Sequence, residues 1–225
     1  MFLKALPQKL KKKETRFVIA TLVITVAVAA ISARYHLTWR SGFCLAAGMY
    51  IALGCFAFSQ KDLFLKRLLL FGLAAGVVEL LADCWLVKST GTLVYPMDEP
   101  MIACSPLYMP LAWAVILIQI GYLGWLISNK EKMWISMLCS TFIGFAVIPL
   151  FEHWAKNAGW WYYQNCKMLG NTPWYIILAE GLICSLLPFF YKYIYEKNYG
   201  WQLILGIIEG LWIWAAYFIA FRIAQ

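Results

Sequence analysis

The chain has 225 residues, of which 63% are hydrophobic and 13% are charged, and its formal net charge is +8. Soluble domains are nearer half apolar and a quarter charged, so this composition excludes an ordinary soluble protein and indicates an integral membrane protein. We attribute the positive charge to anchoring on anionic lipid. The expected partner is therefore the lipid bilayer, and we expect no binding to nucleic acid.

Seven apolar segments are long enough to cross a bilayer as helices, which takes about 20 residues each. In chain order we expect them at residues 17–33, 43–58, 68–87, 107–127, 133–151, 173–191 and 201–221, after a basic tail over residues 1–16. We therefore predict an all-α, polytopic membrane protein. Residues 1–225 are expected to form a single domain, with no obligate protein partner.

Basic residues are distributed unequally between the two ends of these segments. If the N-terminus is cytoplasmic, thirteen Lys and Arg residues fall on the cytoplasmic side and six on the other side. The positive-inside rule then predicts a cytoplasmic N-terminus and a C-terminus on the outer side.

A short sequence frame occurs twice. Residues 106–112 read Pro-Leu-Tyr-Met-Pro-Leu-Ala, and residues 173–179, placed 67 positions later, read Pro-Trp-Tyr-Ile-Ile-Leu-Ala. Each copy follows a helix that carries carboxylates and then a long outer loop, 88–105 or 155–172. The pattern indicates a duplicated helix–loop–helix unit, in which Pro106 and Pro173 open the second helix of each copy.

Seven cysteines are spread along the chain without the spacing of a metal site. Most are expected to be buried as small hydrophobic residues. Cys104 and Cys166 differ, because each lies in an outer loop shortly before a Pro that opens a helix. We name this pair as the candidate disulfide if the outer compartment is oxidising.

Five carboxylates lie inside the predicted spans or at their rim, namely Glu79, Asp83, Glu152, Glu180 and Glu209. Each costs on the order of 2.5–3.5 kcal/mol at mid-helix on insertion scales, and no Lys or Arg lies within those spans. The acids must therefore be protonated, share protons, bind a cation or line a wet cavity. Helix–helix hydrogen bonds between neutral acids are one alternative. We predict instead that all five converge on one pocket as its catalytic groups.

Aromatic residues make up 17% of the chain. Some fit a belt of Trp and Tyr at the membrane interface, and the others are expected to line the pocket. The residues that we assign to substrate binding are Trp85, Tyr95, Tyr108, Trp113, His153, Trp160, Trp161, Tyr162, Tyr175 and Trp212. Such rings bind a long apolar substrate and stabilise a carbocation through cation–π contacts. The stretch from Glu152 to Asn165 is interpreted as the outer cap of this pocket.

Acids and rings together predict acid-initiated carbocation chemistry. A carboxylic acid kept neutral by burial protonates an alkene or epoxide, and loss of a proton or capture of water then completes cyclisation, isomerisation or hydration. The chain has no Asp-rich magnesium motif, no Gly-rich phosphate loop and no HExxH. We therefore expect neither a metal nor a cofactor.

At these residues the chain resembles two groups of small integral-membrane isoprenoid enzymes. One is the carotenoid hydratase and lycopene-cyclase type, and the other is the seven-helix terpene cyclase family that closes meroterpenoid rings. The resemblance covers the length, the helix count and the stretches Glu79-Leu-Leu-Ala-Asp83-Cys-Trp85, Pro-Leu-Tyr-Met-Pro-Leu-Ala-Trp, Gly-Trp-Trp-Tyr-Tyr and Asn-Thr-Pro-Trp-Tyr. It implies cation chemistry on a terpenoid or carotenoid, with Glu79 or Asp83 as an early-helix acid and Glu209 as a last-helix acid.

A proton- or cation-coupled transporter is the main alternative, because mid-membrane acids also serve ion translocation. A receptor, lipid-binding or assembly protein is a third class. A retinal protein is excluded, because residues 201–221 contain no Lys. An enzyme predicts an aromatic-lined cavity that holds several of the acids, whereas a transporter predicts a polar pathway toward one aqueous face.

Overall fold

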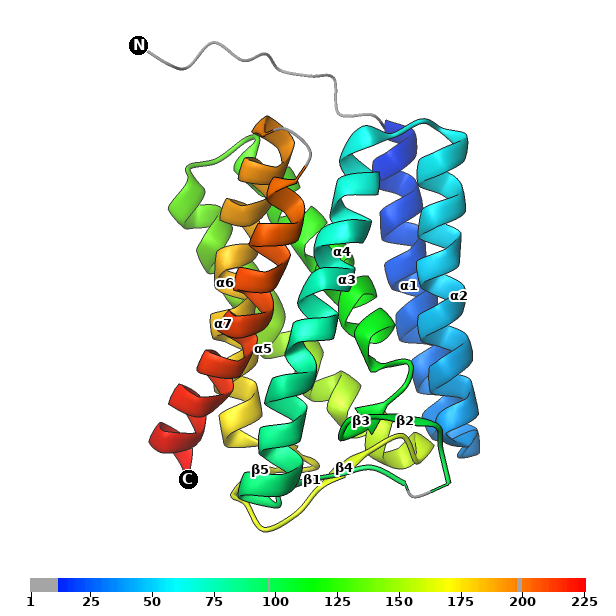
Figure 1. Cartoon of the computed structure of the whole chain (residues 1–225), viewed down its shortest axis with the longest axis vertical. Coiled ribbons are helices and arrows are strands. Elements are labelled where there is room, and N and C mark those ends of the chain that lie inside the picture. The colour runs from blue at the N-terminus through cyan, green and yellow to red at the C-terminus, as the bar shows by residue number, and fades with distance from the viewer. Residues whose placement is uncertain (1–11, 97, 198–199) are drawn as a thin grey trace.

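The computed structural model describes residues 12–96, 98–197 and 200–225. Seven long helices follow one another, namely α1 (Lys12–Tyr35), α2 (Thr38–Ser59), α3 (Leu63–Cys84), α4 (Met109–Ser128), α5 (Met133–Ala158), α6 (Trp174–Glu196) and α7 (Trp201–Ala224). All seven are long and apolar enough to cross a membrane. Figure 1 shows them side by side in one bundle, with the C-terminus at the end opposite the start of α1. The all-α, multi-pass class predicted from the sequence is confirmed.

Most helices extend further than their apolar runs. α1 begins at Lys12 rather than at residue 17, so residues 12–16 of the predicted tail are helical, whereas residues 1–11 lie outside the described part of the chain. α2 and α3 also begin five residues before the predicted positions 43 and 68, and α5 continues to Ala158 instead of ending at 151. Backbone hydrogen bonds continue a helix into polar residues, so an apolar run marks only its lipid-facing part.

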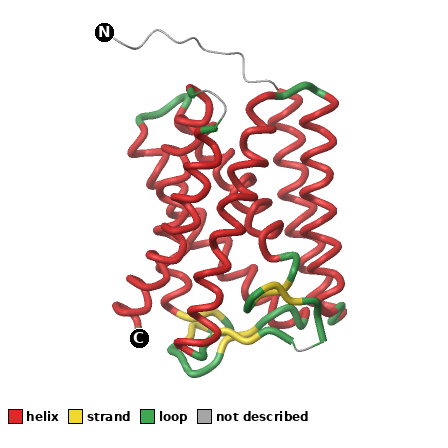
Figure 2. The backbone as a smooth tube through the Cα atoms, in the orientation of Figure 1, coloured by secondary structure: helices red, strands yellow, loops and turns green. Residues whose placement is uncertain are grey.

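Two long connections lie at the end of the bundle that holds the C-terminus (Figure 2). The first cap loop, residues 91–108, follows the π-helical turn η1 (Trp85–Thr90) and contains β1 (Leu93–Val94), β2 (Met101–Ile102) and β3 (Ser105–Pro106). The second cap loop, residues 159–173, contains β4 (Tyr162–Tyr163), β5 (Met168–Leu169) and β6 (Thr172–Pro173). β1 pairs with β4 in antiparallel fashion, so the two cap loops are joined by a short ribbon.

Each cap loop contains a two-stranded hairpin of the same register. β2 pairs with β3 through Met101 and Pro106, and β5 pairs with β6 through Met168 and Pro173. Pro106 does not open a helix as predicted, because it ends β3 and α4 begins only at Met109, whereas Pro173 ends β6 and is also the N-cap residue directly before α6. Proline lacks an N–H donor, so it suits the last residue of so short a strand as well as the first turn of a helix.

Glycines let α3 pack closely on its neighbours. A Cβ atom at Gly76 would collide with the Pro110 carbonyl of α4. Across the α3–α7 contact, a Cβ at Gly210 would lie 2.8 Å from the Ala75 carbonyl oxygen. Small residues at such positions allow membrane helices to approach through their backbones. α3 thereby becomes a central element in contact with α2, α4 and α7.

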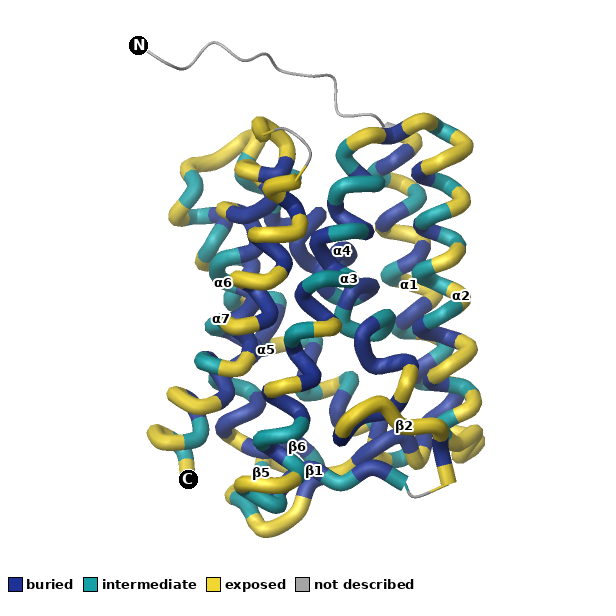
Figure 3. Tube along the Cα trace, in the orientation of Figure 1, coloured by how far each residue is buried: buried dark blue, intermediate teal, exposed yellow. Residues whose placement is uncertain are grey.

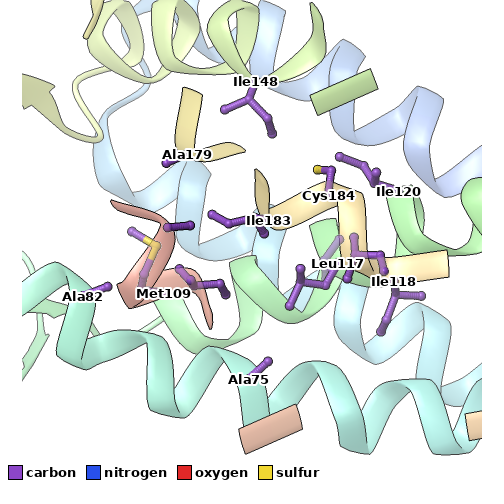
Figure 4. Packing of buried hydrophobic residues seen from close by; sticks show 14 of the residues in the cluster. Ala75, Ala82, Met109, Leu117, Ile118, Ile120, Ile148, Ala179, Ile183 and Cys184 are labelled. Atoms are coloured by element: carbon purple, nitrogen blue, oxygen red, sulfur yellow. The ribbon is translucent and has the colours of Figure 1, made fainter. Parts of the chain in front are cut away.

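Burial separates an interior from an apolar exterior. Figure 3 shows buried backbone toward the centre of the bundle and exposed positions on its outer faces. Large apolar side chains lie on those faces, among them Val23, Ile51 and Phe142, which are 61%, 62% and 67% exposed. In the interior, Figure 4 shows Ile183 and Cys184 of α6 near Leu117 and Ile118 of α4. Soluble proteins rarely expose so much apolar surface, so the outer faces suit contact with lipid.

Candidate active site beneath the two cap loops

A cavity of about 100 Å³ lies where the helices meet the cap loops. Its wall includes side chains from every one of the seven helices and from both cap loops. Most of the wall is aromatic or aliphatic, and none of the Lys and Arg residues that the structure describes belongs to it. Three of the five predicted acids line it, namely Asp83 of α3, Glu152 of α5 and Glu180 of α6. The cavity therefore combines apolar walls with carboxyl groups from three helices.

Each lining acid accepts a hydrogen bond from an aromatic side chain. The Tyr95 hydroxyl donates to Asp83 Oδ2 at 2.6 Å. The Trp161 indole N–H donates to Glu152 Oε2 at 2.6 Å. The Tyr217 hydroxyl donates to Glu180 Oε1 at 2.7 Å. Hydrogen bonds to a carboxyl group fix its orientation and stabilise its ionised form.

The other two acids lie behind this wall. Glu79 adjoins Asp83 and Trp113, and Glu209 lies near Glu180. Both are 0% exposed, whereas the three lining acids keep 3% to 7% of their surface exposed. The Glu79 carboxyl group lies within hydrogen-bonding reach of Asp83 and Trp113, whereas that of Glu209 has no hydrogen-bond partner among the described residues. The structure thus gathers the five acids in one region but brings only three to the cavity.

A disulfide between Cys84 and Cys104 fixes the first cap loop beside Asp83. The predicted pair Cys104–Cys166 is wrong, and Cys166 is a free cysteine. The β2–β3 hairpin turns the first cap loop back onto its own helix, which leaves the Cα atoms of Cys84 and Cys104 only 4.9 Å apart. The positions of Cys104 and Cys166 in the two cap loops suggested a disulfide between these loops. Cys104 pairs with Cys84 instead, because the hairpin brings the first cap loop back to the end of α3.

Trp160 and Trp161 cover the cavity from the second cap loop. Gly159, in the left-handed conformation at φ +76°, ends α5 and turns the chain toward them. The Trp160 indole N–H donates to the Thr38 carbonyl at 3.0 Å and to Ser41 Oγ at 2.9 Å, which ties this ring to the start of α2. The two indole centroids are 5.9 Å apart. Buried indoles need such partners for their N–H groups, so these bonds hold the cover in place.

Five of the ten residues assigned to substrate binding line the cavity, namely Tyr95, Tyr108, Trp113, Trp160 and Trp161. Two of the others belong to the contact with α7. Trp85 packs against Phe218 and Phe221, with ring centroids 5.7 and 5.4 Å away. The Trp212 indole donates to the Leu182 carbonyl at 3.2 Å. These two rings serve helix packing rather than the cavity wall.

The remaining three of the ten lie in or beside the second cap loop. His153 is exposed and bonds Asn157 and Asn171 at 3.0 and 3.1 Å, which fits a rim residue. Tyr162 is 41% exposed. Tyr175 shares a hydrogen bond of 2.7 Å with the Thr92 hydroxyl, so it supports the first cap loop from below.

Several lining residues were not predicted. Phe151 directly precedes Glu152, and Tyr217 lies two helical turns beyond Glu209, so proximity to a predicted acid was their only sequence signal. Tyr163 was passed over within the aromatic run of the second cap loop. α1 and α2 also contribute to the cavity wall, through Thr25, Gly42, Leu45 and Ala46. The sequence did not indicate this, because these residues are small or aliphatic and do not stand out in a membrane helix.

The ionisable groups of the cap loops are perturbed by burial. Burial, together with neighbouring Asp98, raises the pKa of Glu99 to about 7. Burial and the Asp83 carboxyl raise the pKa of the Tyr95 hydroxyl, and burial and Glu152 raise that of Tyr163. Both phenols therefore stay protonated and act as donors. Among the described residues, no three His, Cys, Asp or Glu side chains are grouped as metal ligands.

One protein family matches this chain. The family model described as a domain of unknown function (DUF6989) matches residues 80–224. No match was found among curated proteins or among solved structures. The matched part contains the three lining acids and both cap loops, whereas α1, α2 and the part of α3 up to Glu79 precede it. Since the match covers more than half of the chain, the protein belongs to the DUF6989 family.

Proposed function

We propose that the protein is an integral-membrane enzyme for acid-initiated carbocation chemistry on an isoprenoid such as a terpenoid or carotenoid. The product is a cyclised, isomerised or hydrated isoprenoid, and the reaction needs no cofactor. The observation that carries the proposal is the wall of one cavity, where Asp83, Glu152 and Glu180 meet aromatic rings and no described Lys or Arg side chain. A cation formed there meets carboxyl groups and π-faces, both of which attract it.

The reaction divides between two carboxyl groups. A neutral carboxylic acid breaks its O–H bond and delivers the proton to one carbon of an alkene, which leaves a cation on the neighbouring carbon. The donor, now a carboxylate, is stabilised by its aromatic hydrogen-bond partner, as Asp83 is by Tyr95. A second carboxylate then takes a proton from an adjacent carbon, or from a water molecule that adds to the cation. The donor has then lost one proton and the second carboxyl group has gained one, so the number of protons bound to the protein is unchanged by the reaction.

The size of the cavity limits which part of the substrate it holds. Pockets that enclose a drug-sized ligand measure roughly 300–1,000 Å³, whereas this cavity measures about 100 Å³. We assign it to the reacting end of the isoprenoid. The remaining chain then lies against the apolar helix faces or in the bilayer.

Mass spectrometry of lipid extracts tests this function. Cells with the protein should contain an isoprenoid that is absent from cells without it, and Asp83→Asn or Glu152→Gln should reduce its formation at least about 100-fold, as for loss of a general acid or base. Glu131→Gln, in the exposed turn before α5, is the control and should match the wild type. Full turnover in Asp83→Asn, Glu152→Gln and Glu180→Gln alike would reject the acid mechanism.

Glu209 favours a second candidate, the proton-coupled transporter. Its carboxyl group is fully buried near Glu180 and has no hydrogen-bond partner among the described residues, so the series of buried acids continues beyond the cavity wall. Vesicles that contain the protein and a pH-sensitive dye separate the two functions. A transporter acidifies the lumen when substrate is added and loses this flux in Glu209→Gln, whereas an enzyme changes the lipid without moving protons across the membrane.

We also propose that the N-terminal end of the bundle faces the cytoplasm. The excess of thirteen Lys and Arg residues over six supports this orientation. The Cys84–Cys104 disulfide, which belongs to the cap-loop end, would then form in an oxidising outer compartment. A C-terminal epitope tag should be removed by protease added to intact cells. A tag that is cleaved only after lysis would reverse the orientation.

A further inference from the structure

A polar pair joins α1 to α4 at the deep end of the cavity. The Gln119 side-chain amide of α4 donates to the Thr25 hydroxyl oxygen of α1 at 3.0 Å. At 1.5 Å per helical residue, Thr25 lies about 15 Å from the cap-loop end of its helix. The lining acids Glu152 and Glu180 lie about 9 Å from the same end of α5 and α6. Thr25 is therefore a polar lining residue that lies deeper than these acids.

The pair is only partly hydrogen-bonded. Thr25 accepts from Gln119, but its own O–H has no acceptor among the described residues. Thr21, one helical turn earlier, differs because its hydroxyl donates to the Val18 carbonyl at 2.7 Å. The Gln119 amide oxygen also lacks a partner in the described part of the chain. Buried polar groups are nearly always paired, and lipid supplies no water to pair them, so the Thr25 O–H indicates a place for an acceptor from outside the protein.

The unpaired hydroxyl borders the cavity. Thr25 is 5% exposed and belongs to the cavity wall, whereas Gln119 is 0% exposed and lies behind the wall. The lining residues of α4 one turn before Gln119 are Val115 and Ile116, which offer no side-chain acceptor. Gln119 holds the Thr25 oxygen in place, while the hydroxyl hydrogen rotates about the Cβ–O bond. The O–H can therefore point at an atom inside the cavity.

The chemistry of this donor selects its ligand. A hydroxyl donor binds an oxygen atom that accepts, as in an alcohol, an ether, an epoxide or a carbonyl, whereas a hydrocarbon leaves it unpaired. We propose that Thr25, positioned by Gln119, is a subsite for the oxygen atom of an oxygenated isoprenoid, with the carbon chain of the ligand toward the acids. This assignment rests on the proposed function for the isoprenoid part of the ligand, and it narrows the substrate class to isoprenoids that carry oxygen.

Three ligands that differ only at the oxygen test this subsite. They are geranylgeraniol, its methyl ether, which accepts but does not donate, and the hydrocarbon in which hydrogen replaces the hydroxyl. The full-length protein in lipid nanodiscs is titrated with each ligand, expressed as a mole fraction of the lipid, and the change in tryptophan fluorescence is followed. The wild type should bind the alcohol and the ether about tenfold more tightly than the hydrocarbon, which corresponds to one net hydrogen bond.

Variants on one face of α1 supply the controls. Thr25→Val keeps the shape of the side chain and should abolish the preference for oxygen without changing hydrocarbon binding. Thr25→Ser keeps the hydroxyl and should retain the preference, whereas Gln119→Leu should reduce it because the Thr25 hydroxyl loses its fixed position. Thr21→Val removes a hydroxyl that is buried as well but lies outside the cavity wall, and it should bind all three ligands like the wild type.

Equal binding of the three ligands by the wild type would overturn the subsite, as would an unchanged preference in Thr25→Val. A preference for the alcohol without one for the ether would overturn it too, since the protein would then accept a hydrogen bond instead of donating one. If Thr25→Val does not fold, Gln119→Leu decides, and an unchanged preference there contradicts the pair. Binding needs no turnover, so a protein that prefers the oxygenated ligands but forms no product retains the subsite and loses the proposed catalytic function.

Discussion

Asp83, Glu152 and Glu180 reach the cavity from three helices, and an aromatic side chain holds each of them. The same donors also shape the cavity, because Tyr95, Trp161 and Tyr217 belong to its wall. Acid and ring are thus positioned together. A substitution at one of these rings changes both the space inside the cavity and the hydrogen bonding of the adjacent carboxyl group.

Glu99 gives the first cap loop a pH-dependent stability. Its folded pKa of about 7 lies above its ordinary value of 4.5, so the folded loop binds this proton more tightly than the unfolded chain does. Its contribution to stability is full below the ordinary value and is lost as the pH rises through about 7. Hydrogen exchange of residues 98–107 should therefore accelerate, beyond the intrinsic pH effect, between about pH 5 and about pH 8.

Glu99→Gln should remove this excess acceleration, because glutamine does not titrate. Glu131→Gln, far from the loop in sequence and exposed, should leave it unchanged. The same pH profile in Glu99→Gln as in the wild type would assign the titration to another group.

Residue type was easier to predict than residue position. The shortage of charge made each membrane-embedded carboxylate conspicuous, so all five acids could be named from the sequence. Glu79 and Asp83 are one helical turn apart on the same face, yet only Asp83 lines the cavity. Helical spacing specifies a face but not a depth, and depth depends on where the first cap loop folds over the end of α3.

Among the elements, α3 with α4 and α5 with α6 are joined in the same way. Both connections contain a hairpin of the same register, at Met101–Pro106 and at Met168–Pro173, with the 67-residue spacing of the two sequence frames. The duplicated helix–loop–helix unit itself stays a prediction. The short strands themselves escaped prediction, because two residues are too few to show the alternation that marks a strand.

The approach of α3 to α4 predicts a large effect of one methyl group. Gly76→Ala places a Cβ against the backbone carbonyl of Pro110, which cannot rotate away, so the helices must separate. We expect a loss of roughly 1–3 kcal/mol in stability, as for other overpacked sites, seen as a lower midpoint of thermal unfolding in detergent. Gly48→Ala in α2 is the matched control, since its Cβ would meet nothing within 4 Å. A similar loss in both variants would point to helix propensity or insertion instead.

At the scale of the whole molecule, the cavity is built from the part of the chain that the family model matches and from two helices that precede that part. The match over residues 80–224 holds the three lining acids and both cap loops, while α1 and α2 precede it and still line the cavity through Thr25, Leu45 and Ala46. The three lining acids thus all belong to the matched part, whereas the cavity wall draws on both parts of the chain. The all-α class and the seven apolar helices followed from the sequence, but this closure by small side chains could only be seen in the structure.

Ala46→Phe tests the role of α2 as a wall. A phenyl ring at this lining position fills part of a cavity of about 100 Å³, so binding of geranylgeraniol should weaken at least about tenfold, the scale of steric discrimination in apolar pockets. Ile51→Phe adds a ring to the same helix at a position that is 62% exposed, and it should bind like the wild type. Unchanged binding in Ala46→Phe would place the ligand elsewhere.

The β1–β4 ribbon has a kinetic consequence. Leu93 pairs with Tyr163 and Val94 with Tyr162, so neither cap loop can swing away without the other unless these strands separate. Trp160 adds a tether to α2 through Thr38. The dissociation rate of a ligand that leaves past the cap loops is then limited by one step, the opening of both loops together. Ligands of different size that leave by this route should share one first-order rate constant, even where their affinities differ.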